Sequence, residues 1–207
     1  MTANAQFWDK IARKYAAAPV RDTDAYAKTL DRTRTYLHAD DKVLELGCGS
    51  GTTALTLSPL VGHYRATDWS PKMIEIAREK AVEGPGWLES DVMGADMPGL
   101  PAQSLDVVLA YSLLHLVEDR AYVLKRIYET LKPGGHFISK TVCLDGQGFH
   151  IRLLIPVLRL IGKAPPVAFF TGDALQMEMR KAGFDIIEAE DHNRGPAARF
   201  IVARKPL

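Results

Sequence analysis

The sequence has few cysteines, little net charge and no long uncharged hydrophobic run. Its two cysteines, Cys48 and Cys143, match no metal-binding spacing, which argues against a disulfide framework and indicates a reduced, cytoplasmic protein. The formal net charge is +1 with acidic and basic residues intermixed, so no large basic surface for nucleic acid is expected. No window approaches the ~18 uncharged apolar residues of a membrane span, and the N-terminal residues lack the apolar core of a secretory signal.

The composition is that of one medium-sized globular domain. The chain has 207 residues, of which 47% are hydrophobic and 25% charged, enough to bury a sizeable core. From residue 42 onward, short apolar runs alternate with longer helical patterns. Such alternation predicts βαβ units and an α/β fold with a mostly parallel sheet covered on both faces. Strands are expected over 42–47, 64–69, 86–92, 105–115 and 136–142, and helices over 52–61, 70–84 and about 120–131. The helix over 70–84 is expected to have Ser70 at its cap and Pro71 at its first position.

The last strands break this alternation. Residues 184–192 and 199–206 flank a segment that contains Gly195 and Pro196, so they are expected to pair antiparallel. The sequence "LKPGG", residues 131–135, is interpreted as the signal that ends a helix.

Two helical segments lie outside the predicted sheet. Large apolar residues recur at helical spacing over 7–15, and a second helical pattern begins near Asp22 or Thr23, so residues 1–40 are predicted to form an N-terminal helical cap. Residues 41–207 then form the main domain, with a helical insertion at about 145–172. Within the insertion, Arg152, Arg159 and Lys163 share one face of an otherwise apolar helix.

The stretch "VLELGCGSGT" places three alternating glycines directly after the first strand. A glycine turn lets the backbone approach a ligand, and N–H groups at a helix start favour negative charge, so Gly47 and Gly49 are predicted ligand contacts. Asp68 ends the second strand 21 positions after Gly47, a spacing typical of a carboxylate that binds ribose hydroxyls. Asp91 ends the third strand. A tight turn without a ligand is the alternative for the glycines, and a helix cap or solvated charge for each aspartate.

The order of motifs resembles one enzyme family. A dinucleotide fingerprint requires Gly or Ala at position 52, which is Thr52. The pattern E-x-G-x-G-x-G, from Glu45 to Gly51, instead resembles motif I of the class I S-adenosylmethionine-dependent methyltransferases. The resemblance extends through "ATDWSPKMIEIA", "ESDV", "LDVVLAYSLLHLVED", "LKPGGHFISK" and the closing antiparallel pair, from about residue 7 to the end. It implies a Rossmann-like fold with a mostly parallel seven-stranded sheet, a C-terminal antiparallel hairpin and S-adenosylmethionine as cofactor.

The resemblance also implies which residues contact the cofactor. Glu45 and the glycine backbone would hold its amino acid part, Asp68 its ribose hydroxyls, and Asp91 its exocyclic amine. Trp69 would lie against adenine, with core packing as the alternative. The implied contacts are Glu45, Gly47, Cys48, Gly49, Asp68, Trp69, Asp91, Val92, Tyr111 and Ser112.

The sulfonium already activates the methyl group, so the chain needs chiefly to align an acceptor and exclude water. The sequence contains no nucleophile, metal motif or triad. An O–H or N⁺–H acceptor would require a base, for which the candidates are His115, His150, Tyr15 and Tyr111. A structural histidine is the alternative at His115 and His150.

The acceptor is predicted to be small and hydrophobic or lipid-like. The methyl group is expected to pass to it by direct in-line displacement. The N-terminal helix and the insertion are rich in large apolar residues, which predicts an apolar pocket, and their basic residues allow contact with an anionic membrane surface. S-methylation of a small thiol, which ionises near its ordinary pKa of ~8.5, is one alternative. A non-catalytic cofactor-binding partner subunit is another, and a nicotinamide-dependent oxidoreductase is disfavoured by Thr52. Oligomeric state is not predicted.

Overall fold

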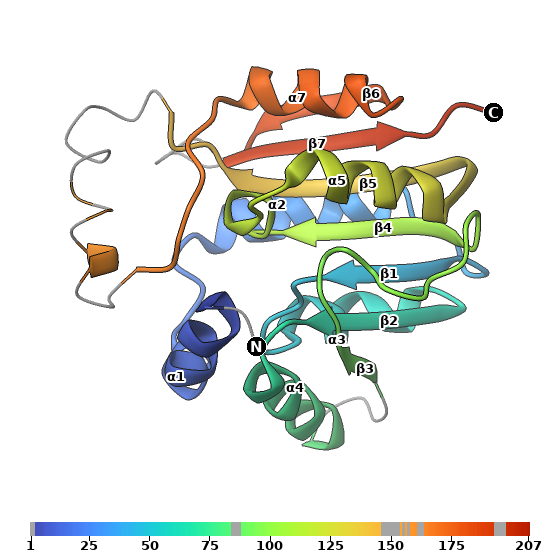
Figure 1. Ribbon diagram of the computed structural model, residues 1–207. Helices are drawn as coiled ribbons and strands as arrows, with labels where there is room; N and C mark the ends of the chain where they lie inside the picture. Colours follow the sequence, from blue (N-terminus) through green and yellow to red (C-terminus); the bar gives the residue numbers. More distant parts are fainter. Residues whose placement is uncertain are drawn as a thin grey trace.

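The computed structural model of the protein describes residues 3–83, 88–145, 154, 156, 158–160, 164–192 and 198–207. Within these residues, seven strands form one sheet in the order β3-β2-β1-β4-β5-β7-β6 (Figure 1). The strands are β1 (Lys42–Leu46), β2 (His63–Asp68), β3 (Glu89–Val92), β4 (Leu105–Tyr111), β5 (Leu131–Val142), β6 (Asp185–Asp191) and β7 (Ala198–Arg204). The first five pair in parallel, and β7 pairs antiparallel with both β5 and β6. The predicted fold is therefore confirmed.

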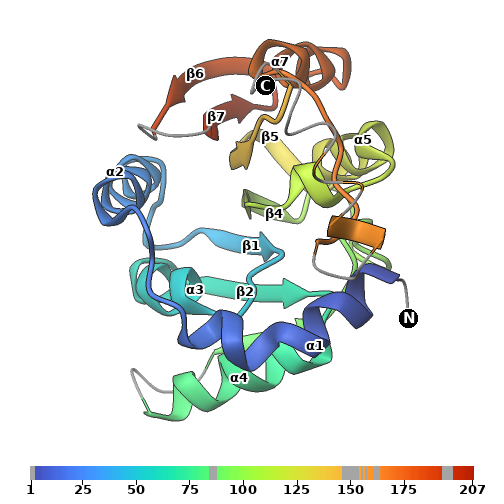
Figure 2. The same cartoon turned by 90° about the vertical axis from the view of Figure 1, so that its left-hand side faces the viewer.

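Helices cover both faces of the sheet (Figure 2). They are α1 (Ala3–Ala17), α2 (Thr23–Arg34), α3 (Thr52–Leu57), α4 (Pro71–Glu83), α5 (Arg120–Thr130) and α7 (Gly172–Lys181), with short 3₁₀ turns η1 (Ser58–Leu60) and η2 (Leu114–Leu116). Apolar side chains of α2, α3 and α4 share one buried cluster with Val43 and Val107, whereas those of α5 and α7 share another with Leu44 and Val108. Successive strand residues thus point to opposite faces, and each face is buried.

Polar N-cap side chains accept hydrogen bonds at the starts of α2, α4, α5 and α7, and the sequence predicts the caps of α2 and α4. The Asp22 carboxylate accepts a hydrogen bond from the Ala25 N–H at 2.9 Å. The Ser70 hydroxyl accepts one from the Met73 N–H at 3.1 Å, directly before Pro71. These bonds satisfy N–H groups that have no partner within the helix.

Helix α1 lies beside α4 at the carboxyl edge of the sheet (Figure 2). Asp9 accepts hydrogen bonds from the Ser70 hydroxyl at 2.5 Å and the Lys72 N–H at 3.1 Å. Arg13 forms a two-bond ion pair with Glu79, at 2.5 and 2.8 Å. Helix α2 instead covers a sheet face, so the two N-terminal helices occupy different places. The division into a cap of 1–40 and a domain of 41–207 stays a prediction.

Two segments differ from the sequence expectations. Helix α5 ends at Thr130, and "LKPGG" belongs to β5, where the register against β4 jumps from Leu105↔Leu131 to Val107↔His136. The glycines accommodate a bulge there rather than only ending the helix, with Gly134 at a φ of +79°. Helix α7 was not anticipated. Its N-cap is Thr171, whose hydroxyl accepts a hydrogen bond from the Ala174 N–H at 3.1 Å.

The predicted insertion is described only in part. Positions 154, 156 and 158–160 are helical, and Arg159 is exposed. Arg152, Lys163 and His150 lie outside the described residues. None of the helices in the described ranges has the length and hydrophobicity needed to cross a membrane.

Gly51→Ala is predicted to destabilise the fold more than Gly99→Ala. Both glycines have positive φ, +77° and +76°, so replacing either one by alanine introduces a similar backbone strain. A Cβ at Gly51 would lie 2.8 Å from the Ala77 Cβ in α4, whereas a Cβ at Gly99 would meet nothing within 4 Å. Urea unfolding is expected to show an additional loss of about 1–3 kcal/mol for the Gly51 variant. Equal losses in the two variants would contradict the close packing of the glycine turn on α4.

Candidate active site

A cavity of about 410 Å³ opens where the parallel strands end. It lies between the turn after β1, the end of β2, the loop after β3 and the end of β4, and α1 and Pro166 line it from the other side. In an open α/β sheet, ligands bind at this edge, where the connections diverge. The main lining residues are Trp8, Tyr15, Gly47, Gly49, Asp68, Trp69, Met73, Met93, Asp96, Tyr111, Ser112, Leu113, Leu116, Val117, Glu118, Tyr122, Val123, Arg159 and Pro166.

The glycine turn lines the cavity with backbone. Gly47 has a φ of +69°, and a Cβ there would lie 2.9 Å from the Leu113 Cδ1. Gly49 has a φ of +55°, and a Cβ there would face the cavity, with only the Tyr15 Cε1 nearby at 3.8 Å. Gly49 therefore leaves room for a ligand to approach the chain. Cys48, between them, is buried and outside the cavity lining, and its cofactor contact stays a prediction.

Asp68 connects the turn to the end of β2. Its carboxylate accepts hydrogen bonds from the Gly49 N–H at 3.0 Å and the Ser70 N–H at 2.8 Å, and it also lines the cavity. Burial raises the pKa of Asp68, although these N–H donors oppose the shift. A carboxylate has about four lone-pair sites, so Asp68 can hold the turn and still accept hydrogen bonds from a ligand.

Glu45 lies beneath the turn rather than in the cavity lining. It is 2% exposed, and the Tyr64 hydroxyl donates a hydrogen bond to its Oε2 at 2.8 Å. Burial raises the pKa of Glu45 to about 7, and the nearby Asp68 adds to the shift. A cationic ligand group next to the turn would reverse this effect by favouring the ionised carboxylate.

Two aspartates, one in β3 and one in the loop after it, have different surroundings. Asp91 accepts hydrogen bonds from the Arg65 side chain at 2.5 and 2.9 Å and does not line the cavity. Asp96 does line it, next to Trp69, and both side chains approach Gly94 closely. Val92 lines a separate hollow beside α4. The adenine contacts of Asp91 and Val92 stay predictions, and Asp96 is a cavity acid that the sequence analysis missed within a loop.

The candidate bases are placed differently from one another. Tyr15 and Tyr111 line the cavity, and burial raises the pKa of both. The Tyr111 hydroxyl lies 2.6 Å from the Thr33 Oγ1 in α2. His115 lies outside the lining, with its Nδ1 3.0 Å from the Thr141 Oγ1, and burial lowers its pKa to about 4. The catalytic roles stay predictions, and the one for His150 falls outside the described residues.

The rest of the cavity lining, from α1 and from η2 to α5, is mainly apolar. Trp8 packs edge-to-face on Tyr15 with ring centroids 5.4 Å apart. Leu116, Val117, Tyr122 and Val123 follow from η2 to α5, with the side chains of Glu118 and Asp119 between them. Among the described lining residues Arg159 is the only basic side chain. The sequence contains no signal that brings Trp8 and Tyr122 together, because their elements are distant in the chain.

The two ends of the cavity suit different chemical groups. One end has glycine backbone, the Asp68 carboxylate, the exposed Trp69 ring and the buried Glu45, which fit an adenosyl group that carries an amino acid. The room in front of Gly49 supports this fit, because any side chain there would enter the cavity. The other end fits a small apolar molecule.

The chain matches the protein family described as "Methyltransferase domain" over residues 44–139, a little under half of its length. It is 29% identical over 188 residues to the 27-O-demethylrifamycin SV methyltransferase of Amycolatopsis mediterranei, covering 89% of this chain and 67% of that protein. It is 32% identical over 139 residues to the carboxy-S-adenosyl-L-methionine synthase of Dichelobacter nodosus, covering 63% and 58%.

Among solved structures, the chain resembles an S-adenosylmethionine-dependent methyltransferase from Mesorhizobium loti. The TM-score is 0.74 at 21% identity, with 89% of this chain and 99% of that chain covered. At this identity the likeness shows the fold.

Asp68→Asn is predicted to weaken cofactor binding. The charged carboxylate accepts stronger hydrogen bonds than an amide, and losing one such bond costs about 1.5–3 kcal/mol, roughly a tenfold to hundredfold rise in Kd. Calorimetric titration with S-adenosylhomocysteine measures this directly. The matched control is Asp106→Asn, because Asp106 bonds Lys42 and Lys132 at the opposite edge of the sheet. An unchanged Kd in the Asp68 variant would contradict the site.

Glu45→Gln is predicted to change how stability depends on pH. The folded chain keeps the Glu45 proton up to about pH 7, whereas the unfolded chain releases it near the ordinary value of 4.5. Between these values the unfolded state binds fewer protons, so wild-type stability falls by about 1.4 kcal/mol per pH unit from this group.

Urea unfolding without cofactor is expected to show the Gln variant gaining about 3 kcal/mol on wild type between about pH 4.5 and 7, and no more above pH 7. The lowered pKa of His115 makes stability rise with pH, but His115 is present in both proteins, so its contribution cancels in the difference between them. A difference independent of pH would show that Glu45 is ionised in the folded protein.

Proposed function

Because the chain belongs to the class I S-adenosylmethionine-dependent methyltransferases, we propose that it transfers the cofactor's methyl group to a small hydrophobic or lipid-like acceptor. The observation that carries the proposal is one cavity that is lined by glycine backbone and Asp68 where β1 and β2 end, and by mostly apolar side chains from η2 to α5, where Glu118 and Asp119 are the acidic exceptions. The chain spans 67% and 58% of the two curated relatives above, so the acceptors of those proteins are not carried over.

S-adenosylmethionine supplies an activated methyl group when it is bound. The chain's own part begins with binding. The Gly49 backbone leaves room for the ligand, and Asp68 is placed to accept hydrogen bonds from hydroxyl groups. Glu45 balances a positive charge near the turn, because such a charge favours the ionised form of this buried carboxyl.

The apolar end orients the acceptor and excludes water. Trp8 and Tyr15 cover one side of the cavity, and Leu116, Val117 and Tyr122 cover another. Holding two reactants together in a dry site removes much of the entropic barrier to a bimolecular reaction. In this proposal α1 closes the cavity, and its ion pair between Arg13 and Glu79 keeps it in place.

S-methylation of a small thiol is the second candidate, because it does not depend on the histidine and tyrosine bases predicted from the sequence. His115 is outside the lining, and the raised pKa values of Tyr15 and Tyr111 keep both phenols protonated at neutral pH. A thiol ionises near pH ~8.5 without assistance. We also propose a cytoplasmic location, which two free, buried cysteines support.

The experiment that tests the function is transfer of labelled methyl from S-adenosylmethionine into an extract, which is then separated into lipid, volatile, aqueous and macromolecular fractions. Label in the lipid fraction supports a hydrophobic acceptor, and label in the volatile fraction supports a small thiol. Label confined to the aqueous or macromolecular fraction would contradict the apolar acceptor. Cofactor binding without any label would favour a non-catalytic partner subunit.

Tyr122→Asp is predicted to impair acceptor binding without affecting the cofactor. Tyr122 is 50% exposed at the apolar end, so the variant is expected to fold, but its charge would meet an apolar acceptor. Losing one such contact and desolvating a charge is expected to raise the acceptor KM at least tenfold. Met177→Asp, an exposed apolar residue of α7 outside the cavity lining, is the control. Equal KM values in wild type and the Tyr122 variant would move the acceptor elsewhere.

A further inference from the structure

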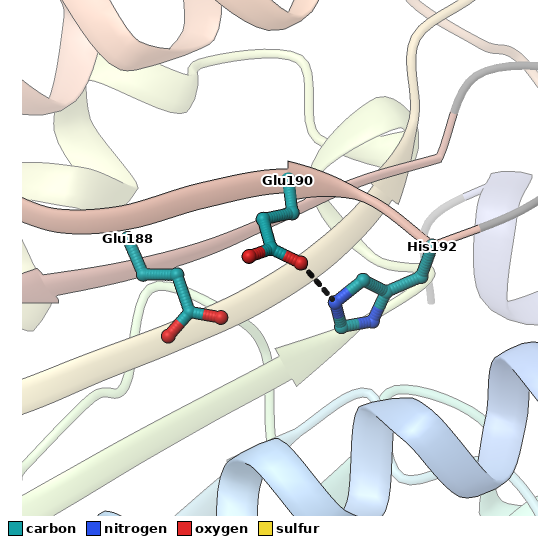
Figure 3. A group of neighbouring side chains, drawn as sticks. All are labelled: Glu188, Glu190 and His192. Atoms are coloured by element: carbon teal, nitrogen blue, oxygen red, sulfur yellow. Dashed lines mark ion pairs between the residues drawn. The ribbon is translucent and has the colours of Figure 1, made fainter.

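Outside the cavity lining, three potential metal ligands lie on and just beyond the edge strand β6. Glu188 and Glu190 alternate along the strand, and His192 follows it at the same spacing. Figure 3 shows their side chains on one side of the strand, with the Glu190 carboxylate turned toward the His192 ring. One ligand atom from each residue lies within 4.8 Å of the other two.

Hydrogen bonding determines which nitrogen of His192 has a free lone pair. The Thr29 hydroxyl donates to the Ala25 carbonyl at 2.7 Å, which occupies its only proton. Its oxygen is 3.1 Å from the His192 Nδ1, so it accepts the hydrogen bond and the ring proton lies on Nδ1. The other nitrogen, Nε2, then has an available lone pair. Histidines that bind metals typically have their second nitrogen held in this way.

The Nε2 atom is buried and points into the cluster. His192 is 7% exposed, and its Nε2 has no hydrogen-bond partner. It lies 3.7 Å from the Glu190 Oε2, so two lone-pair atoms face each other across a short gap. A cation between the two atoms would satisfy both.

We propose that His192, Glu190 and Glu188 bind a divalent transition-metal ion. Imidazole nitrogen and carboxylate oxygen are ligands that Zn²⁺ and related ions accept, with water at the remaining position. Ligand atoms around a tetrahedral Zn²⁺ are about 3.4 Å apart, given metal–ligand distances of about 2.1 Å. The His192–Glu190 separation of 3.7 Å is already near this value. The Glu188 ligand atom lies within 4.8 Å of the other two, so it has to move closer by at most about 1.4 Å.

Two cations of α2 compete with a metal at this site. Lys28 Nζ is 2.8 Å from the same Glu190 oxygen, and its side chain is half exposed, so it can turn into solvent. Arg32 bonds both oxygens of Glu188, and Tyr36 donates to one of them. Glu188 has further lone pairs, so it can keep Arg32 while it binds a metal. The competition predicts that removing Lys28 strengthens metal binding.

The test is calorimetric titration of the metal-free full chain with Zn²⁺. Wild type is expected to bind one equivalent, and Glu190→Gln and His192→Ala are expected to raise Kd at least tenfold. The His192 ring stacks on Phe200 with ring centroids 4.4 Å apart, so replacing His192 can disturb the fold. Glu190 is exposed, so Glu190→Gln tests the site without that risk. Lys28→Ala is expected to lower Kd.

His63→Ala is the control for surface binding, because His63 forms an exposed pair with Glu89 on β3 and leaves β6 unchanged. The proposal is overturned if wild type does not bind Zn²⁺, or if Glu190→Gln binds it with unchanged Kd. Loss of binding in Lys28→Ala also overturns it, and leaves an ion-pair network that joins α2 to β6. Metal binding is read out without methyl transfer, so the result is independent of the proposed function.

Discussion

The hydrogen bond from the Gly49 N–H to the Asp68 carboxylate connects the two strand ends on which the site depends. It holds the glycine turn after β1 against the end of β2 at 3.0 Å, and the second carboxylate oxygen fixes the chain entering α4 through the Ser70 N–H. The same N-terminus of α4 binds Asp9 of α1. One partly buried acid therefore positions the turn, a helix start and, through that helix, the wall that closes the cavity.

The cavity has a more polar and a more apolar part because strand ends line one part and helices line the other. The strand ends supply backbone and acids, since parallel strands finish at one edge where connections diverge. The apolar end is supplied by α1, η2 and α5, which bury their remaining apolar side chains in the core. This asymmetry suits a charged nucleoside cofactor beside an uncharged acceptor. It also separates cofactor affinity from acceptor affinity, so each can be changed by a different substitution.

Much of the fold could be predicted from signals between neighbouring residues. Most features that the sequence did not predict depend on contacts between residues far apart in the chain. The helix caps at Asp22 and Ser70, the strand periods and the glycine spacing were readable because each involves neighbouring residues. The pairing of Asp91 with Arg65 was not, because it joins two strands 26 positions apart. Trp8 enters the site only through the packing of α1 on α4. The bulge at Gly134 depends on the register of β5 against β4, which no single segment encodes.

The central claim, that the glycine turn and Asp68 form the cofactor site, is tested most directly by hydrogen–deuterium exchange with S-adenosylhomocysteine and with NAD in parallel. Bound ligand slows exchange where it orders backbone. We predict protection by S-adenosylhomocysteine in peptides that cover residues 45–52, 66–70, 93–97 and 111–119, and none by NAD. Protection by NAD over 45–52, or by S-adenosylhomocysteine only outside these ranges, would contradict the account.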